Sequence, residues 1–325
     1  MARVFSGIKP TGELQLGNYL GALRHWVREQ NPDALYCLVD LHALTVDLDP
    51  ADLQRDSLEM AIGLLAAGLD PERCTVFVQS HVAEHARLCW LLECTVTYGE
   101  LQRMTQFKDK AGRNETVRGG LLTYPALMAA DILLYDTEAV PVGDDQRQHV
   151  ELTREIAERF NNRFGRTFVV PEAVYPKVAA RVMDLQDPTR KMSKTEDSPQ
   201  GTILMFDEPE AISRKVRRAV TDTDGDVRYD PESKPGVSNL LEILASLSDE
   251  DPRVVAARYD AYGPLKDDVA EAIIAALAPI KARRDELAAD PGTVHQLLAT
   301  GAERARATAA VTYAKAASAM GLLAP

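Results

Sequence analysis

The hydrophobic residues in the first half of the chain form short runs, separated by longer segments with helical spacing. The short runs, which have the character of strands, are 3–6, 34–39, 75–79 and 139–142. Between them, apolar residues recur at helical intervals over 18–29, 51–67, 82–92 and 124–135. Alternation of this kind predicts crossover connections and a parallel sheet. We therefore expect a doubly wound α/β domain that gathers its ligands at the carboxyl ends of the strands.

The pattern changes after a predicted helix over 145–160. Residues 184–200 are polar and lack an apolar period. Beyond them the spacing is almost wholly helical, over 211–220, 238–245, 252–259, 265–287 and 293–320. The sequence thus predicts a Rossmann-like α/β domain over residues 1–185 and a smaller all-helical domain over residues 186–325.

The chain has 325 residues and a net charge of −12, which argues against a protein that coats nucleic acid with its whole surface. We expect no DNA partner, whereas a local basic patch would be enough for contact with RNA. Basic clusters occur at 214–218, 281–284 and 304–306. Each is interpreted most simply as a solvated helix face with carboxylate partners at i,i+4.

Four cysteines lie in apolar segments and lack the C-x-x-C spacing of zinc sites: Cys37, Cys74, Cys89 and Cys94. They are predicted to be reduced core residues. Apolar stretches such as 272–277 are too short to cross a bilayer. The first residues lead directly into a strand, without a signal-peptide pattern. These observations predict a cytoplasmic protein without a membrane partner.

Two segments suit the binding of phosphate, although no P-loop motif occurs. The first follows the first strand, where glycines and Pro10 lead to Gly17 and Asn18 at the start of a helix. Exposed N–H groups at a helix N-terminus attract anions, although a plain Gly/Pro connection would look the same. The second carries Lys191 and Lys194, which could close over a polyphosphate. A solvated basic loop is the alternative, and the presence of both segments favours phosphate.

With these segments in place, the sequence resembles the class I aminoacyl-tRNA synthetases, and the tryptophanyl-tRNA synthetases in particular. Residues 191–195 (KMSKT) resemble the KMSKS loop of that family, and residues 15–18 (QLGN) take the place of its HIGH motif. The resemblance covers residues 3 to about 321, and its motifs follow the family's order; the further matching segments are 5–8, 17–22, 99–108, 124–133 and 143–149. The HIGH-like tetrapeptide keeps only its glycine, with Gln15 and Asn18 in the places of the two histidines. In addition, Lys9 replaces glutamine and Thr195 replaces serine.

The resemblance implies activation of L-tryptophan by ATP and its transfer to tRNA(Trp). It implies Mg²⁺ bound through the ATP phosphates, no protein-bound metal, anticodon recognition by the helical domain, and a homodimer formed through 92–107. Catalytic roles fall to Gly17, Asn18, Lys191 and Lys194. The implied ATP-binding residues are Lys9, Pro10, Thr11, Gly17, Asn18, Gly143, Asp144, Asp145, Val182, Lys191, Met192, Ser193, Lys194 and Thr195, and Lys110 is a further candidate for the triphosphate.

Asp131 lies in an apolar predicted helix, where an unpaired carboxylate would be costly. An indole N–H is a donor only, which suits a carboxylate that only accepts. The alternative is a pairing with an Arg, a Lys or a backbone N–H of the protein. The resemblance favours the indole. The full set of residues that it implies for tryptophan is Asp131, Met128, Tyr124, Gln146, Phe5, Gly7 and His42, with Val140 as a further wall.

Three other functions remain open from the sequence. A tyrosyl-tRNA synthetase would share the fold, and a phenol would also need an acceptor. Another nucleotidyltransferase of the superfamily would lack the long helical half. A paralogue that binds tRNA or a protein without catalysis is suggested by Gln15 and Lys9, whereas the intact lysine loop counts against it.

Overall fold

The computed structural model describes residues 3–111, 117–143, 146–174, 181–193 and 199–323. In this part of the chain, parallel strands form one sheet with the order β3-β2-β1-β4-β5. The strands are β1 (Val4–Ile8), β2 (Ala34–Leu38), β3 (Thr75–Val78), β4 (Ala139–Pro141) and β5 (Glu172–Val174). The order reverses direction between β1 and β4, as in doubly wound sheets, so the predicted fold class is confirmed. The sequence pattern missed β5, whereas β4, which is equally short, was predicted within the run 139–142.

The predicted helices of the first half are present, although one of them is not uniform. The segment predicted as a single helix over 18–29 consists of α1 (Leu16–Asn18), the π-helical turn η1 (Tyr19–Leu23) and α2 (Arg24–Glu29). The structure also contains short helices that the sequence did not predict, because a segment of so few residues cannot show a helical period. The remaining elements are α3 (Asp40–Ala43), α4 (Pro50–Ala66), η2 (Gln79–His81), α5 (Glu84–Glu93), α6 (Tyr98–Arg103), α7 (Thr105–Ala111), α8 (Gly119–Leu133) and α9 (Arg147–Phe164).

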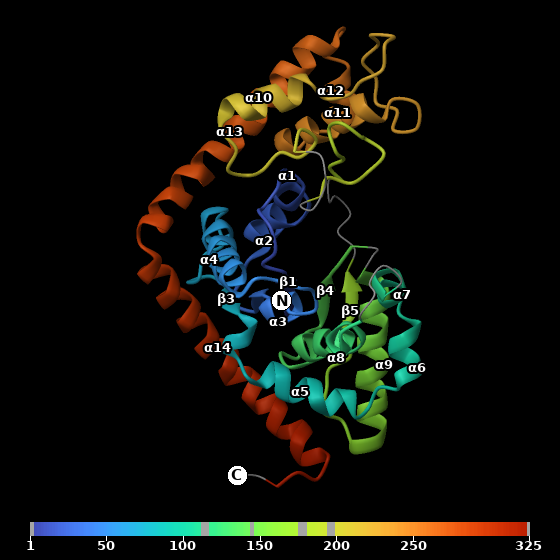
Figure 1. Ribbon diagram of the computed structural model, residues 1–325, viewed down its shortest axis with the longest axis vertical. Coiled ribbons are helices and arrows are strands. Elements are labelled where there is room, and N and C mark those ends of the chain that lie inside the picture. Colours follow the sequence, from blue (N-terminus) through green and yellow to red (C-terminus); the bar gives the residue numbers. More distant parts are fainter. Residues whose placement is uncertain (1–2, 112–116, 144–145, 175–180, 194–198, 324–325) are drawn as a thin grey trace.

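The second half is helical, as predicted. Its helices are α10 (Pro209–Arg217), α11 (Pro235–Ser248), α12 (Pro252–Ala256), α13 (Tyr262–Ala289) and α14 (Pro291–Ala319). Four of the five begin with proline, which is favoured in the first helical turn because its missing N–H costs nothing there. Figure 1 shows α13 running from α10–α12 back toward α4, and α14 continuing along the first half of the molecule. The division at residue 185 stays a prediction, and α14 packs against β3 and α5 of the first half.

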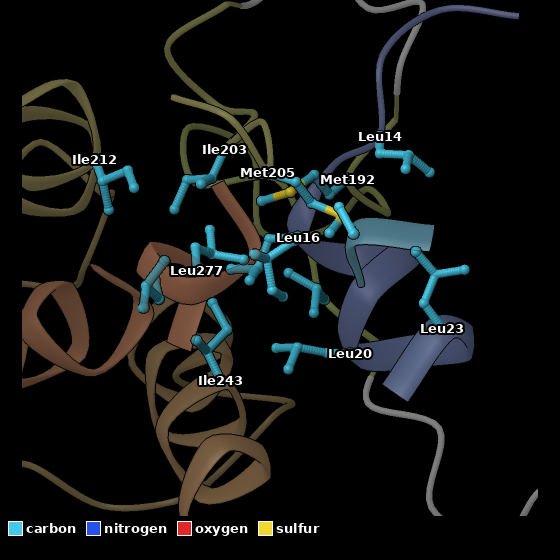
Figure 2. Close-up of a cluster of buried hydrophobic side chains, with 14 of the residues drawn as sticks. Leu14, Leu16, Leu20, Leu23, Met192, Ile203, Met205, Ile212, Ile243 and Leu277 are labelled. Carbon is cyan, nitrogen blue, oxygen red and sulfur yellow. The ribbon is translucent and has the colours of Figure 1, made fainter. Parts of the chain in front are cut away.

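One hydrophobic core joins the segment around α1 to the helical half. Leu16 is fully buried, and Figure 2 shows it among side chains from three parts of the chain. The labelled residues of this cluster are Leu14, Leu16, Leu20, Leu23, Met192, Ile203, Met205, Ile212, Ile243 and Leu277. The start of α1 and the segment around Met192, which carry the two candidate phosphate motifs, therefore pack into the same core.

The helix α14 approaches the sheet so closely that one position requires glycine. A Cβ atom added at Gly301 would lie 1.9 Å from the carbonyl oxygen of Val76 in β3. Gly301→Ala is therefore expected to lower the free energy of unfolding by roughly 1–3 kcal/mol, the usual cost of overpacking, as measured by urea denaturation. Gly263→Ala in α13 is the matched control, since nothing lies within 4 Å of its added methyl group. Equal stability of the two variants would contradict this account of the contact.

The cysteines differ in exposure more than the sequence suggested. All four thiols are free, as predicted; Cys37 and Cys74 are buried and Cys89 is half-buried. Cys94 is exposed, so its prediction as a core residue was wrong. It follows the last residue of α5, at the C-cap of that helix. No helix in the described part of the chain is long and apolar enough to cross a membrane.

The basic clusters are engaged mainly with other parts of the protein. Lys215 and Arg217 form ion pairs with Asp207 and Asp267, and Lys281 and Arg284 pair with Glu208 and Glu59. Arg304 and Arg306 donate to backbone carbonyl groups of Pro71 and His81. The expectation of i,i+4 partners was therefore wrong for these residues, because their partners lie on other elements.

Candidate active site

A cavity of about 360 Å³ lies at the carboxyl ends of β1, β2 and β4, beside α8. This is the edge of the sheet where doubly wound proteins bind ligands. The cavity is lined by all seven residues that the sequence analysis assigned to tryptophan: Phe5, Gly7, His42, Tyr124, Met128, Asp131 and Gln146. Lys9, Val140 and Gly143 also line it. The folded chain thus brings these residues to one site from four separate segments.

The Asp131 carboxylate is buried and held by three side chains. Its Oδ1 accepts hydrogen bonds from Gln79 Nε2 at 2.7 Å and from His85 Nδ1 at 2.6 Å. Its Oδ2 accepts a hydrogen bond from His42 Nε2 at 2.8 Å. The partners are thus two imidazoles and an amide, rather than the Arg, Lys or backbone N–H weighed as the alternative. A carboxylate can accept about four hydrogen bonds, so these three leave capacity for one more donor.

The surroundings of Asp131 keep it ionised. Burial alone would raise the pKa of this carboxyl group, but the hydrogen bonds from His42 and His85 outweigh burial and lower the pKa to about 2. At neutral pH, the cavity therefore presents a carboxylate that can only accept.

Tyr135 extends this network on the side of His85. Burial raises the pKa of Tyr135 well above its ordinary value, so the phenol keeps its proton. Its OH group lies 2.7 Å from His85 Nε2. With the phenol as donor, His85 carries its own proton on Nδ1 and donates it to Asp131. Phe5 stacks on Tyr135 with ring centroids 5.7 Å apart, which links the cavity wall to the network.

The sequence analysis missed Gln79, His85 and Tyr135. Asp131 itself could have led to them, because a buried carboxylate in an apolar helix requires donors. Gln79 follows the apolar strand 75–78, and His85 lies in a predicted helix, so both were available as donors. Nothing in the spacing of these residues along the chain pairs them with Asp131.

The lowered pKa of Asp131 predicts a pH dependence of stability. The folded-state pKa of about 2 lies below the ordinary 3.8, so the stabilisation is present above about pH 4 and is lost as the pH falls toward 2. One pKa unit corresponds to 1.36 kcal/mol, so the contribution is on the order of 2 kcal/mol. Urea denaturation between pH 5 and pH 2.5 measures it. Asp131→Asn should show a shallower loss of stability over this range, and identical slopes for the two proteins would contradict the prediction.

The candidate phosphate segments meet at Gln15. Its side-chain Oε1 accepts a hydrogen bond from Gly17 N at 2.5 Å, and its Nε2 donates to the carbonyl oxygen of Met192 at 3.0 Å. Met192 N in turn donates to Val182 O at 3.0 Å. Gly17, Asn18, Val182 and Met192 are thus linked through Gln15 and the backbone.

The other residues predicted to bind ATP differ in whether they line the cavity. Lys9 and Gly143 line the cavity, and Pro10 and Thr11 follow directly on Lys9. Lys191 is exposed and Ser193 half-buried, and neither lines the cavity. Asp144, Asp145, Lys194 and Thr195 lie outside the described residues, as does the side chain of Lys110.

Known proteins match this chain over its full length. The model of the class I tRNA synthetases (W and Y) matches residues 1–278. Tryptophan–tRNA ligase 1 of Streptomyces coelicolor is 59% identical over 332 residues, covering 100% of this chain and 98% of the relative. The tryptophan–tRNA ligase of Bacillus anthracis is 49% identical over 325 residues, covering 99% of this chain and 98% of the relative.

Solved structures agree as well. The tryptophanyl-tRNA synthetase of Mycoplasma pneumoniae matches with a TM-score of 0.91 and 37% identity, over 99% of this chain and 98% of that one. The enzyme of Campylobacter jejuni, complexed with ADP and tryptophan, matches with a TM-score of 0.84 and 34% identity, over 98% of this chain and 100% of that one. The chain therefore belongs to the class I tRNA synthetases and, among them, to the bacterial-type tryptophanyl-tRNA synthetases, a family of aminoacyl-tRNA ligases.

Proposed function

We propose that the chain carries out the reaction of its family, the ligation of tryptophan to tRNA(Trp), at the cavity around Asp131. The observation that carries this proposal is the ionised Asp131 carboxylate, which lines the cavity and can accept one more hydrogen bond. An indole N–H would fill that place as a pure donor. His42, Gln79 and His85 would hold the carboxylate in position for it.

The remaining cavity residues suit the rest of the amino acid. Phe5, Tyr124 and Met128 offer aromatic and thioether surfaces for a flat ring. Gln146 offers an amide oxygen to an ammonium group, and Gly7 leaves room at the end of β1. Tryptophan thus has an acceptor for its one ring donor and apolar walls for its faces.

The first step of the proposed reaction needs positioning more than acid–base chemistry. An oxygen of the tryptophan carboxylate attacks the α-phosphorus of ATP, and the bond from that phosphorus to the leaving pyrophosphate breaks. The substrate carboxylate is already a nucleophile, so the protein contributes orientation and charge stabilisation. Lys191 and Lys194 would stabilise the developing charge, while Gly17 and Asn18 hold ATP. Mg²⁺ would be bound by the phosphates and would neutralise part of their charge.

Tryptophan-dependent exchange of pyrophosphate into ATP tests this function. We expect exchange with tryptophan, and none with tyrosine or phenylalanine. Exchange with tyrosine alone would favour the tyrosyl enzyme. Absence of exchange with all three amino acids would favour a paralogue that binds RNA or protein without catalysis.

In the second step, a ribose hydroxyl at the end of tRNA takes the tryptophanyl group and AMP leaves. We assign recognition of the anticodon to the helical half, since unstacked bases need a surface of their own. Because the basic clusters form ion pairs within the protein, we do not assign the contact with tRNA to particular residues of the helical half. A cytoplasmic location fits an enzyme whose substrates are tRNA and ATP.

We assign the homodimer to the surface formed by α5 and α6. Trp90 and Tyr98 on these helices are each 65% exposed, which is unusual for large aromatic side chains in a monomer. Cys94 between them is exposed as well. The predicted interface over 92–107 contains Tyr98 and Cys94, and Trp90 lies two residues before it in α5.

Light scattering of the Tyr98→Lys variant tests the dimer. We expect the wild-type chain to have twice the mass of one chain, and the variant to shift toward the monomer. Val254→Lys on α12 is the matched control, because Val254 is also exposed but lies away from α5 and α6. A variant that remains as dimeric as the control would move the interface elsewhere.

A further inference from the structure

Gln15 is the residue at which this chain departs from the histidine of its family's signature, and its side chain makes two hydrogen bonds of opposite kind. At one end, Oε1 accepts from Gly17 N, which caps the first turn of α1. At the other end, Nε2 donates to the carbonyl oxygen of Met192, 177 residues away in the sequence. Gln15 is 3% exposed, and its bond to the Met192 carbonyl oxygen is buried, whereas its bond to Gly17 N is partly buried.

The hydrogen bonds themselves determine the orientation of the Gln15 amide. A backbone N–H can only donate, so the atom beside Gly17 N has to be the oxygen. A carbonyl oxygen can only accept, so the atom beside Met192 O has to be the nitrogen. The two contacts agree, and a flipped amide would break both hydrogen bonds.

Met192 is thereby fixed from both sides of its backbone. Its N–H donates to Val182 O, and its carbonyl oxygen accepts from Gln15. Its side chain is 2% exposed and lies beside Leu16 in the core (Figure 2). Lys191 is the preceding residue in the chain and is exposed. A fixed Met192 therefore limits where the backbone of Lys191 can lie relative to α1.

Residues 203–205 also form hydrogen bonds with the start of α1. Leu16 N donates to Ile203 O, and Met205 N donates to Leu14 O, both at 2.9 Å. These bonds connect α1 with residues 203–205, but they do not reach residues 191–193. Within the described residues, the Gln15 side chain makes the hydrogen bond that joins α1 directly to Met192.

We propose that Gln15 is a positioning residue, which ties the Lys191–Ser193 segment to the start of α1 and so sets the place of Lys191 at the ATP site. This inference rests on the proposed role of Lys191 and goes beyond it by naming the residue that positions it. The tether needs the full length of glutamine, because one end of the side chain is occupied by the cap. A shorter N-cap residue keeps the cap and loses the tether.

Two variants separate these roles. Gln15→Asn keeps an acceptor that is well suited to the N-cap and is too short to reach Met192 O. Gln15→Met has the length of glutamine and neither bond. Gln186→Asn is the matched control, since Gln186 Nε2 donates to Arg218 O at 2.9 Å near the same segment but does not touch α1. KM for ATP, KM for tryptophan and kcat are measured for each variant by pyrophosphate exchange, together with the melting temperature.

Both Gln15 variants are expected to lower kcat, the constant on which Lys191 acts, by roughly 3- to 10-fold, the equivalent of one hydrogen bond, and to leave KM for tryptophan unchanged. The control should match the wild type in both constants. Normal kinetics in Gln15→Asn would overturn the proposal. If Gln15→Met were impaired at the same time, Gln15 would have a role in the cap alone. An equal rise in both KM values would overturn it too, because that pattern indicates general damage to the site.

Hydrogen exchange at the Met192 amide gives a second measurement that does not depend on catalysis. We expect faster exchange there in both Gln15 variants, with unchanged exchange in α8. Unchanged exchange at Met192 would overturn the tether even if the kinetics had changed. Exchange activity of the wild-type chain tests the proposed function separately, so the two failures can be told apart.

Discussion

Replacing Asp131 with asparagine is expected to raise KM for tryptophan by roughly 10- to 100-fold, because a hydrogen bond to a charged group is worth about 1.5–3 kcal/mol. The asparagine amide nitrogen would face donors where the carboxylate now accepts from His42, Gln79 and His85. The network would lose bonds of its own, as well as the place left for an indole N–H. Pyrophosphate exchange at varied tryptophan concentration measures the effect.

Two comparisons make the Asp131 result specific. KM for ATP in the same variant should stay close to the wild-type value, since Asp131 lies among the residues proposed for the amino acid. The melting temperature shows whether the loss of buried hydrogen bonds has unfolded the protein. A KM for tryptophan within twofold of the wild-type value would mean that Asp131 serves only to hold its histidine and glutamine partners.

Replacing Lys191 with alanine is expected to lower kcat for pyrophosphate exchange by roughly 100- to 1000-fold, the usual loss when one group that stabilises transition-state charge is removed. Lys191 is exposed, so the substitution should leave the stability of the fold nearly unchanged. KM for tryptophan should also stay the same. Single-turnover formation of the adenylate measures the chemical step directly.

Lys281→Ala is the charge-matched control for Lys191, because it removes one positive charge from the helical half, where Lys281 pairs with Glu208. It should keep the wild-type kcat. A Lys191 variant as active as this control would assign the charge stabilisation to other groups.

The sequence predicted those parts of the fold that rest on local periodicity. The strands β1, β2 and β3 and the long helices carry enough residues to show periods of two or 3.6, so their positions followed from spacing alone; β4 was predicted as part of the apolar run 139–142. The three-residue strand β5 and the short helices α3, α6 and α7 carry too few. The π-helical turn at Tyr19–Leu23 was also beyond reach, because its apolar spacing resembles that of an ordinary helix.

The candidate site was predictable where chemistry singled out one residue. Asp131 stood out because a carboxylate in an apolar helix needs a partner, and the cavity residues near it followed from the family's motifs. The partners of Asp131 were not predictable, since Gln79 and His85 are separated from it by 52 and 46 residues. The bond between Gln15 and Met192 depends likewise on the folded backbone, which brings distant segments to within 3.0 Å.

The close packing of α14 on β3 determines how long the edge of β3 is exposed during synthesis of the chain. β3 is the outermost strand on its side of the sheet, and such an edge can pair with strands of other molecules. Its cover, α14, begins only at Pro291, whereas β3 ends at Val78. On the ribosome, β3 therefore emerges long before the helix that shields it, and nascent chains are open to edge-to-edge association for most of translation. The edge strand β3 is therefore covered only after the C-terminal helix α14 has been synthesised.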